Sequence, residues 1–404
     1  MKTMKKLYLI LCSGLVALFA LSCNKDATPT PMTPNQVKEK TADVVVNALN
    51  EVDPDNWKEW GQTGLGLINE LSDIVKEGQA DQSVIDFVQN LRNLFVKESG
   101  NKVEILIKLS QITGEITVSK DKKVTYTASS NPVSLTMPYN GKDYKLQMEV
   151  KGESSTALLL YYEGENTLSV YVPQTIGLHL TQSGGTYMDL VVNPVINDKN
   201  GNGKLDADDS IGANFTLQIP DYKFTGTDVT VAEDFAVGIF ELTHNTTSVF
   251  LLDGKLEFNM HITDGNISMD VDDAEINKLS LMGGQAILIA EADVQDLENI
   301  SSHYESEASA EAAARSISKS LKAELFFDNN TNLAQASLVP MVVAGKESGY
   351  DVVPGIHYAD GSADETLESV GNDPVWDSVS QKASDIAGKL TKYFHDLLPS
   401  NSIK

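Results

Sequence analysis

The chain has 404 residues, of which 57 are Asp or Glu and 31 are Lys or Arg, so its formal net charge at pH 7 is −26. Arg92 and Arg315 are the only arginines, and so acidic a chain with so few guanidinium groups argues against a surface that binds nucleic acid or phosphate. The hydrophobic fraction of 41% and the length allow a sizeable core, in one large domain or two.

The first 22 residues have the features of a secretory signal peptide. Lys2, Lys5 and Lys6 make the start basic, and an apolar run at residues 7–21 follows. The run is shorter than the roughly 20 residues that a spanning helix needs, which favours cleavage over membrane insertion. We therefore expect residues 1–22 to be a cleaved leader.

The leader ends in Ala20-Leu21-Ser22-Cys23, which resembles the lipobox of bacterial lipoproteins. The resemblance implies cleavage before Cys23 and acylation, for example with palmitate, of its thiol and its new amino group. Several acyl chains would hold the protein firmly, because each buried methylene contributes about 0.8 kcal/mol. The alternative is an ordinary signal peptide followed by a chance cysteine. Cys12 leaves with the leader, so no intramolecular disulfide is expected.

Residues 23–34 are expected to form a tether behind the lipid. Three prolines among polar residues predict an extended, semi-rigid segment. Lys25-Asp26 resembles the export tag of Bacteroides-type surface lipoproteins, although Ala27 stands where that tag usually carries a second acid. The resemblance implies a lipid anchor in the outer membrane and exposure at the cell surface, with a periplasm-facing position as the alternative.

Residues 35–100 are predicted to be helical, because their apolar residues recur at helical spacing. Asp53-Pro54 is expected to end the first helix, and Asp81 is a plausible cap for the third. Trp57 and Trp60 are expected to lie in the core. The glycines of Gly61-x-x-Gly64-x-Gly66 fall inside the second helix, so they indicate helix packing rather than a nucleotide-binding loop.

The remaining chain predicts strands and then a mixed region. Apolar and polar residues alternate over residues 101–298, with turn signals about every ten residues, which is typical of an antiparallel meander in one or two sheets. Residues 299–404 predict a helix, a hairpin and a last helix capped at Asp373, packed on the same body. The expected fold class is α+β, with helices from both ends of the chain around a long antiparallel meander.

Residues 198–209 match the twelve-residue calcium loop of EF-hands. Calcium prefers six to eight oxygen ligands, which such a loop supplies from positions 1, 3, 5, 7, 9 and 12 with glycine at position 6. Gly203 stands at position 6, and the match predicts a calcium ion as cofactor. The predicted ligands are Asp198, Asn200, Asn202, the Lys204 carbonyl, Asp206 and Asp209.

The loop resembles those of dockerins in particular, which also end in aspartate. Strands rather than helices are predicted on both sides of it, and no second loop lies nearby, so the resemblance implies ion coordination and neither cohesin binding nor a calcium-sensor switch. A structural ion that fixes a long connection is the favoured interpretation. The alternatives are an ion that bridges to a glycan, and a stretch of Asn, Asp and Gly that only makes turns.

Catalytic and zinc-binding patterns are missing from the sequence. None of the motifs of a serine hydrolase, a phosphate-binding loop or a zinc protease occurs. The acids at 272–275 could serve glycoside hydrolysis only if they were suitably spaced in the fold, and a solvated turn is the preferred interpretation. The histidines are scattered along the chain: His179, His244, His261, His303, His357 and His395.

We expect a non-catalytic, lipid-anchored envelope protein with a structural calcium site. It is attached to the membrane through Cys23, binds no nucleic acid, and has a glycan, a lipid or a partner protein as its ligand. The alternatives are an envelope hydrolase acting on glycans and a structural or adhesive subunit of a surface assembly. The three tryptophans all fall on predicted helices, which argues against a cleft that stacks sugars.

Overall fold

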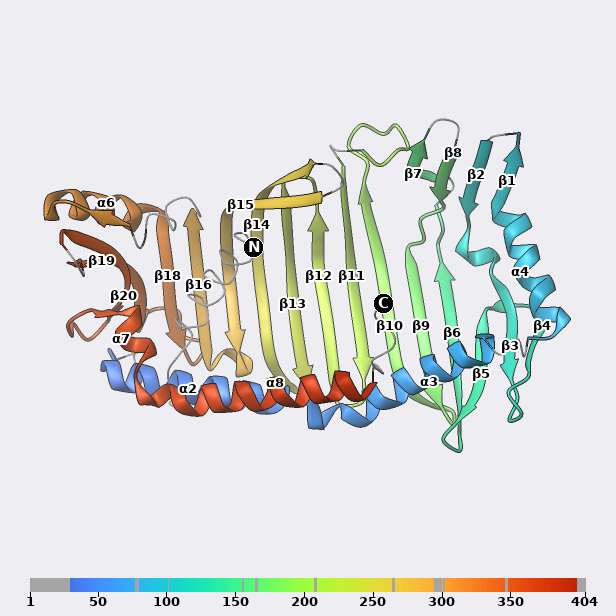
Figure 1. Ribbon diagram of the computed structural model, residues 1–404, viewed down its shortest axis with the longest axis horizontal. Coiled ribbons are helices and arrows are strands. Elements are labelled where there is room, and N and C mark those ends of the chain that lie inside the picture. Colours follow the sequence, from blue (N-terminus) through green and yellow to red (C-terminus); the bar gives the residue numbers. More distant parts are fainter. Residues whose placement is uncertain are drawn as a thin grey trace. The chain divides into compact units, whose positions relative to one another are not determined.

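A computed structural model (Figure 1) describes residues 30–76, 80–100, 102–154, 156–163, 166–206, 209–263, 266–293, 300, 302–345 and 348–397. The fold is α+β, with helices at the N-terminus, antiparallel strands and a long helix at the C-terminus, as predicted. The chain divides into two compact units. Unit 2 comprises Trp57–Glu233, and unit 1 combines Met1–Asn56 with Asp234–Lys404. The segment boundaries expected at residues 100 and 298 fall inside these units.

Unit 2 begins with two helices, α3 (Lys58–Lys76) and α4 (Gln82–Phe95). The prediction that Asp81 caps α4 is confirmed, because its carboxylate accepts the Ser83 N–H at 2.9 Å. Helix was expected to continue to Gly100, but β1 (Val96–Ser99) follows α4 directly. Val96–Ser99 pairs along its whole length with the next strand, β2 (Lys102–Ile107), and this hairpin pairing overrides local helix propensity.

The strands of unit 2 form two sheets. In the larger one, neighbouring strands run antiparallel except for the parallel pair β3–β5. Strands β7 and β8, expected in the meander, pair instead in a small sheet of order β1-β2-β8-β7, so β6 pairs directly with β9. The larger sheet contains β3 (Thr113–Val118), β4 (Val124–Pro132), β5 (Ser134–Tyr139), β6 (Lys142–Lys151), β9 (Thr175–Gln182), β10 (Gly185–Asn197), β11 (Ser210–Ile219) and β12 (Tyr222–Val231); the small sheet adds β2 (Lys102–Ile107), β7 (Leu158–Glu163) and β8 (Asn166–Val170), and a 3-10 turn, η2 (Leu109–Gln111), precedes β3.

The larger sheet of unit 2 has one apolar side and one polar side. Directly paired residues share a side, so the register assigns each strand's alternate residues to the same face. We call the side of β6 and β9–β12 that carries the apolar residues the apolar face. The opposite side carries polar residues such as Gln147, His179 and Thr216. Representative residues of the apolar face are Leu178, Leu180, Leu190, Val192, Phe215 and Leu217.

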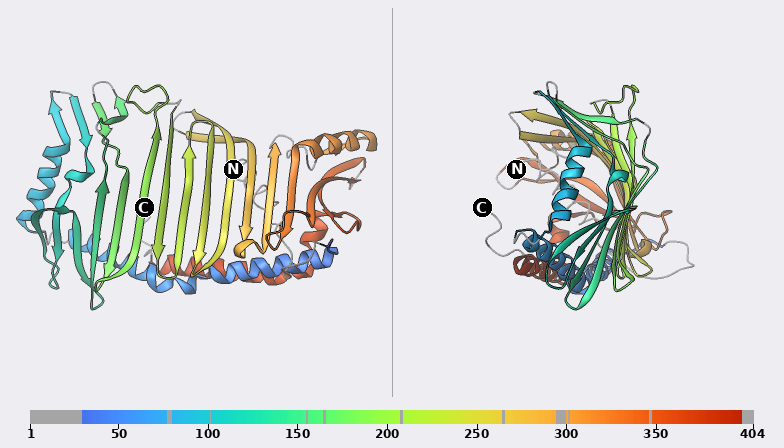
Figure 2. Two further views of the ribbon diagram at one scale, coloured as in Figure 1. Left: turned by 180° about the vertical axis from the view of Figure 1, so that it is seen from behind. Right: turned by 90° about the vertical axis from the view of Figure 1, so that its right-hand side faces the viewer.

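Helices α3 and α4 cover one end of this side of the sheet. Leu67 and Ile74 of α3 pack with Val118, Val124 and Met137 in a buried cluster. Phe87 of α4 stacks on Tyr126 with ring centroids 4.2 Å apart. The side view in Figure 2 shows the strands of unit 2 bent, with α4 on their concave side. The apolar face is therefore on the concave side of the sheet.

The expectation that the glycines of α3 serve helix packing is met at Gly66, whereas a Cβ at Gly64 would meet no atom within 4 Å. Gly66 lies in the helix, and a Cβ there would be only 1.8 Å from the Tyr139 hydroxyl oxygen. Trp57 and Trp60 are half-buried rather than fully buried, so the expectation that they lie in the core is only partly met.

Unit 1 contains a second set of antiparallel strands and most of the helical residues. Helix α2 (Pro34–Glu51) and α8 (Asp377–Leu397) come from opposite ends of the chain and lie side by side (Figures 1 and 2). The other elements are η1 (Pro54–Asn56), β13 (Phe235–His244), β14 (Thr247–Thr263), β15 (Asn266–Leu281), η3 (Met282–Gly284), β16 (Ala286–Asp293), β17 (His303–Tyr304), α6 (Glu307–Ser320), β18 (Leu321–Phe327), β19 (Ala336–Ala344), β20 (Tyr350–Tyr358), β21 (Glu365–Thr366), α7 (Leu367–Gly371) and η4 (Pro374–Trp376).

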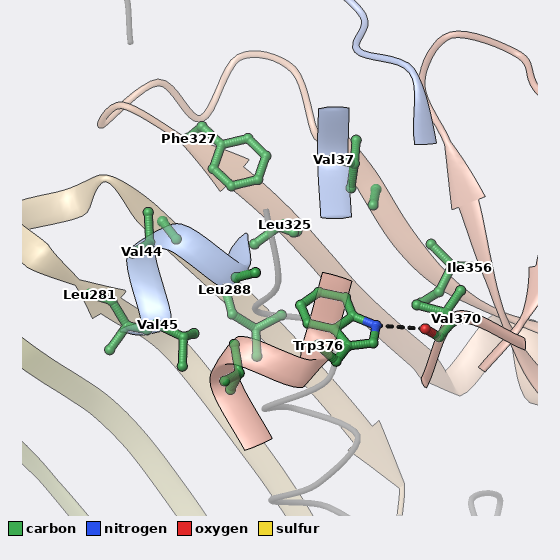
Figure 3. Close-up of a cluster of buried hydrophobic side chains, with 14 of the residues drawn as sticks. Val37, Val44, Val45, Leu281, Leu288, Leu325, Phe327, Ile356, Val370 and Trp376 are labelled. Atoms are coloured by element: carbon green, nitrogen blue, oxygen red, sulfur yellow. Dashed lines mark hydrogen bonds between the residues drawn. The ribbon is translucent and has the colours of Figure 1, made fainter. Parts of the chain in front are cut away.

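The core of unit 1 joins both ends of the chain to the strands. Val44 of α2 and Leu288 of β16 are completely buried in one cluster with Trp376 (Figure 3). The Trp376 indole N–H donates to the Val370 carbonyl at 2.6 Å. The prediction that Asp373 caps the last helical segment is confirmed, since its carboxylate accepts the Val375 N–H at 3.2 Å. The C-terminal helices thus pack on the strands, as expected.

The acids at 272–275 do not form a turn, so that prediction was wrong. They lie within β15, where Ala274 is buried and pairs with Leu256 and Ala292. Asp273 and Glu275 flank it and are exposed. The segment therefore alternates as an ordinary strand with one buried side.

Candidate functional site

The predicted calcium loop connects β10 to β11 in unit 2. Asn197 and Ser210, which flank the loop, are paired in the antiparallel ladder. The expectation of strands on both sides is confirmed, and residues 198–209 therefore close a hairpin rather than link two helices. Residues 207 and 208 lie outside the described structure, whereas all six predicted ligand residues lie inside it.

Asp198, at loop position 1, binds the backbone of the next turn. Its Oδ1 accepts the N–H of Gly201 at 2.7 Å and that of Asn202 at 3.2 Å, and its Oδ2 accepts the N–H of Gly203 at 2.8 Å. Gly201 and Gly203 have φ of +66° and +73°, in the left-handed region that glycine adopts without strain. The loop backbone is thereby wrapped around the Asp198 carboxylate.

The two asparagines and Asp206 come together on the same side of the loop. The Nδ2 groups of Asn200 and Asn202 donate to Asp206 Oδ2 at 3.0 and 2.9 Å. Their Oδ1 atoms accept the N–H groups of Asn202 and Lys204 at 3.0 and 2.7 Å. Positions 3, 5 and 9 are thus within hydrogen-bond distance of one another.

Asp209, at position 12, is the most buried of the loop's described acids, with only 5% of its surface exposed. Its two carboxylate oxygens accept the N–H groups of Lys199 and Asp206 at 3.0 and 2.9 Å. Among the described residues no lysine, arginine or histidine side chain forms an ion pair with it. A buried carboxylate without a cation is costly, so a positive charge at this place would stabilise the loop.

The loop is also attached to the small sheet of unit 2. The Leu159 N–H donates to the Gly203 carbonyl at 3.0 Å, and the Leu205 N–H donates to the Leu159 carbonyl at 2.9 Å. The two segments form a parallel bridge at Leu159 and Lys204. β7 therefore supports the middle of the loop.

The donor set suits a hard cation that binds oxygen. Asp198, Asp206 and Asp209 supply carboxylates, Asn200 and Asn202 supply amide oxygens, and Lys204 supplies its backbone carbonyl. Each carboxylate or carbonyl oxygen has two lone pairs, so one that accepts a single N–H can still bind an ion. The two amides would have to turn their oxygens toward the ion. Within the described ranges no three His, Cys, Asp or Glu side chains lie together as metal ligands, so an ion in this loop would also need amide and carbonyl oxygens.

The predicted lipidation site cannot be placed. Cys23 and the leader at residues 1–22 lie outside the described residues, as does the tether up to residue 29. In the part of the chain that is described, no helix is long and apolar enough to cross a membrane.

Histidines in the described structure pair with acids that lie next to them. His303 Nδ1 lies 2.7 Å from Asp351, and His357 Nδ1 lies 2.8 Å from Asp364. Both histidines are more than half exposed, at 53% and 51% of their side chains. These contacts are surface ion pairs when the histidine is protonated, and each contributes little to stability.

Sequence reasoning did not identify the apolar face as a candidate site. Its signal was present, because apolar residues alternate along each of its strands. Alternation alone does not say whether a face is covered, since that depends on helices packed from elsewhere in the chain. Comparison with family models, with curated proteins and with solved structures finds no match for this chain.

Proposed function

We propose that this protein is a non-catalytic lipoprotein of the bacterial envelope that binds a ligand and carries a structural calcium ion in the loop 198–209. Acyl groups on Cys23 anchor it in the outer membrane, facing the cell surface. The envelope hydrolase and the adhesive subunit remain the alternative functions.

The observation that carries the calcium proposal is the environment of Asp209. This carboxylate is buried, accepts only backbone N–H groups among the described residues, and belongs to the same loop as the other four side chains predicted to be ligands. A calcium ion would supply the missing positive charge. It would also hold together the two strands that the loop connects, which is why the role is structural.

The experiment is a thermal unfolding measurement in calcium and in chelator. Extracellular calcium modules have Kd values of about 10⁻⁴ to 10⁻³ M, so 10 mM calcium would stabilise the protein by roughly 1.4 to 2.7 kcal/mol. For a unit of this size that is a rise in Tm of roughly 3 to 10 °C. Asp198→Asn combined with Asp209→Asn should abolish the rise.

For each variant we compare the difference between its Tm in calcium and its Tm in chelator, because the substitutions also disturb hydrogen bonds of the calcium-free loop. Asp360→Asn with Asp364→Asn removes two acids from a connection in unit 1 and serves as the matched control. The control should keep the full calcium response. An equal response in the loop variant and the parent would refute the site.

A further inference from the structure

We propose that the apolar face of unit 2 binds the acyl chain of a lipid. This inference names a ligand class for the binding role proposed above and rests on that role, but it does not depend on the calcium ion. It rests on the extent of the face, on its chemistry and on what covers each end.

The face is large for an exposed apolar surface. From Met188 to Ile196 a strand rises about 26 Å, and five neighbouring strands at about 4.8 Å each make the face roughly 24 Å wide. Its plan area is therefore roughly 600 Å², of which the side chains expose a part. Leu178, Leu190, Val192, Phe215 and Leu217 are half-buried, not buried.

The described helices of unit 2 leave most of the face uncovered. Their hydrophobic cluster reaches Tyr144, Leu180 and Tyr187 at one end of the strands. At the opposite end, Ile211 and Val231 are paired across β11 and β12 and are 45% and 47% exposed. The end of the face beside α3 is thus covered by the helix, and the end beside the loop 198–209 is exposed to solvent.

The chemistry of the face favours hydrocarbon over protein. The backbone groups of β9, β10 and β11 are engaged in ladders on both sides, and its side chains between these ends carry no hydrogen-bonding group. A protein interface forms about one hydrogen bond per 100–200 Å², and away from Tyr144 and Tyr222 at the end beside α3 the side chains of this face could offer none. An acyl chain needs none.

Phe215 packs across two neighbouring strands on the apolar face. Its ring lies over Gly226 of β12, where a Cβ would be 2.2 Å from the ring. The ring centroid lies 5.5 Å from that of Phe224. The two rings therefore lie across neighbouring strands, and they give a smooth apolar surface.

A second copy of the chain fits the face less well. A stable interface buries about 800 Å² on each partner, more than this face provides. Two copies would each carry a formal charge of −26, which opposes their association.

The test uses cis-parinaric acid, a fatty acid that fluoresces in apolar surroundings, with the chain from residue 24 onward and without detergent. We expect saturable binding that unlabelled palmitate displaces. Phe215→Asp should weaken binding at least tenfold. Ile211→Asp alters a side chain that is already exposed, so it should weaken binding without unfolding the protein.

Thr216→Asp is the matched control, because it adds the same charge to the polar side of the same strand. It should bind like the parent. Absent binding by a folded parent, or equal binding by Ile211→Asp and Thr216→Asp, would overturn the proposal. So would a parent that sediments as a dimer and becomes monomeric in Ile211→Asp.

The two proposals fail separately. A parent that responds to calcium but binds no fatty acid refutes the lipid site alone. Fatty-acid binding without any calcium response refutes the calcium site alone.

Discussion

Replacing Asp53 tests how the two ends of the chain are joined in unit 1. Asp53 follows α2, is 8% exposed, and accepts hydrogen bonds from Lys382 and Lys389 of α8 at 2.6 and 2.8 Å. Burial alone would raise the pKa of this carboxyl. The hydrogen bonds from the two lysines more than offset burial and lower the pKa from its ordinary 3.8 to about 2.

The free energy follows from this pKa. A fall from 3.8 to about 2 is worth roughly 2 kcal/mol, at 1.36 kcal/mol per pH unit. A carboxyl with a lowered pKa in the folded state stabilises the fold above its ordinary pKa, and this contribution is lost as the pH falls from about 4 to about 2. At pH 7 we therefore expect Asp53→Asn to lower the Tm by roughly 4 to 8 °C.

The assay is thermal unfolding followed by the fluorescence of Trp376, in a background of Trp57→Phe and Trp60→Phe so that only unit 1 is observed. Asp55→Asn is the control, because Asp55 contacts the same Lys389 at 2.7 Å but is 60% exposed. Asp55→Asn should lower the free energy of unfolding by less than about 1 kcal/mol. The difference in Tm between the parent and Asp53→Asn should stay constant between pH 7 and 5 and become smaller only below about pH 4. A deficit no larger than that of Asp55→Asn, or one that changes between pH 7 and 5, would refute the reasoning.

Two further substitutions test packing and helix capping in unit 1. Leu288→Ala removes a completely buried side chain of β16 and should cost about 2–5 kcal/mol in urea unfolding; a cost under about 1 kcal/mol would mean that the site is not tightly packed. Ser306→Ala removes the side chain that accepts the Ser309 N–H at the start of α6. It should cost about 1 kcal/mol and speed amide exchange in the first turn of α6, and unchanged exchange there would contradict the capping role.

Features that depend on neighbours in sequence were predictable. The caps at Asp81 and Asp373 and the end of α2 before Asp53-Pro54 all depend on residues within a few positions. The oxygen-bearing residues of the loop follow from spacing in the same way. The structure adds that Asp209 is buried, which sequence could not say because burial depends on how the loop packs.

Features that depend on which strands pair were not predictable. Val96–Ser99 forms a strand because β2 is available beside it, and residues 272–275 lie in a strand because β14 and β16 flank them. The departure of β7 and β8 from the meander likewise depends on β2, which pairs in parallel with β8. Local patterns contain no information on such pairings.

The proposed calcium loop and the apolar face belong to one hairpin, β10–β11. A slip of one residue between β10 and β11 would move Val192 from beside Phe215 to the polar side, and every apolar side chain of the strand with it. The loop joins the strands at the last pair of the face, Ile196 and Ile211. Closing so long a connection costs conformational entropy, and a flexible loop tolerates alternative registers. An ion bound by six loop residues would remove that freedom and would reinforce the register that the ladder between the two strands already sets.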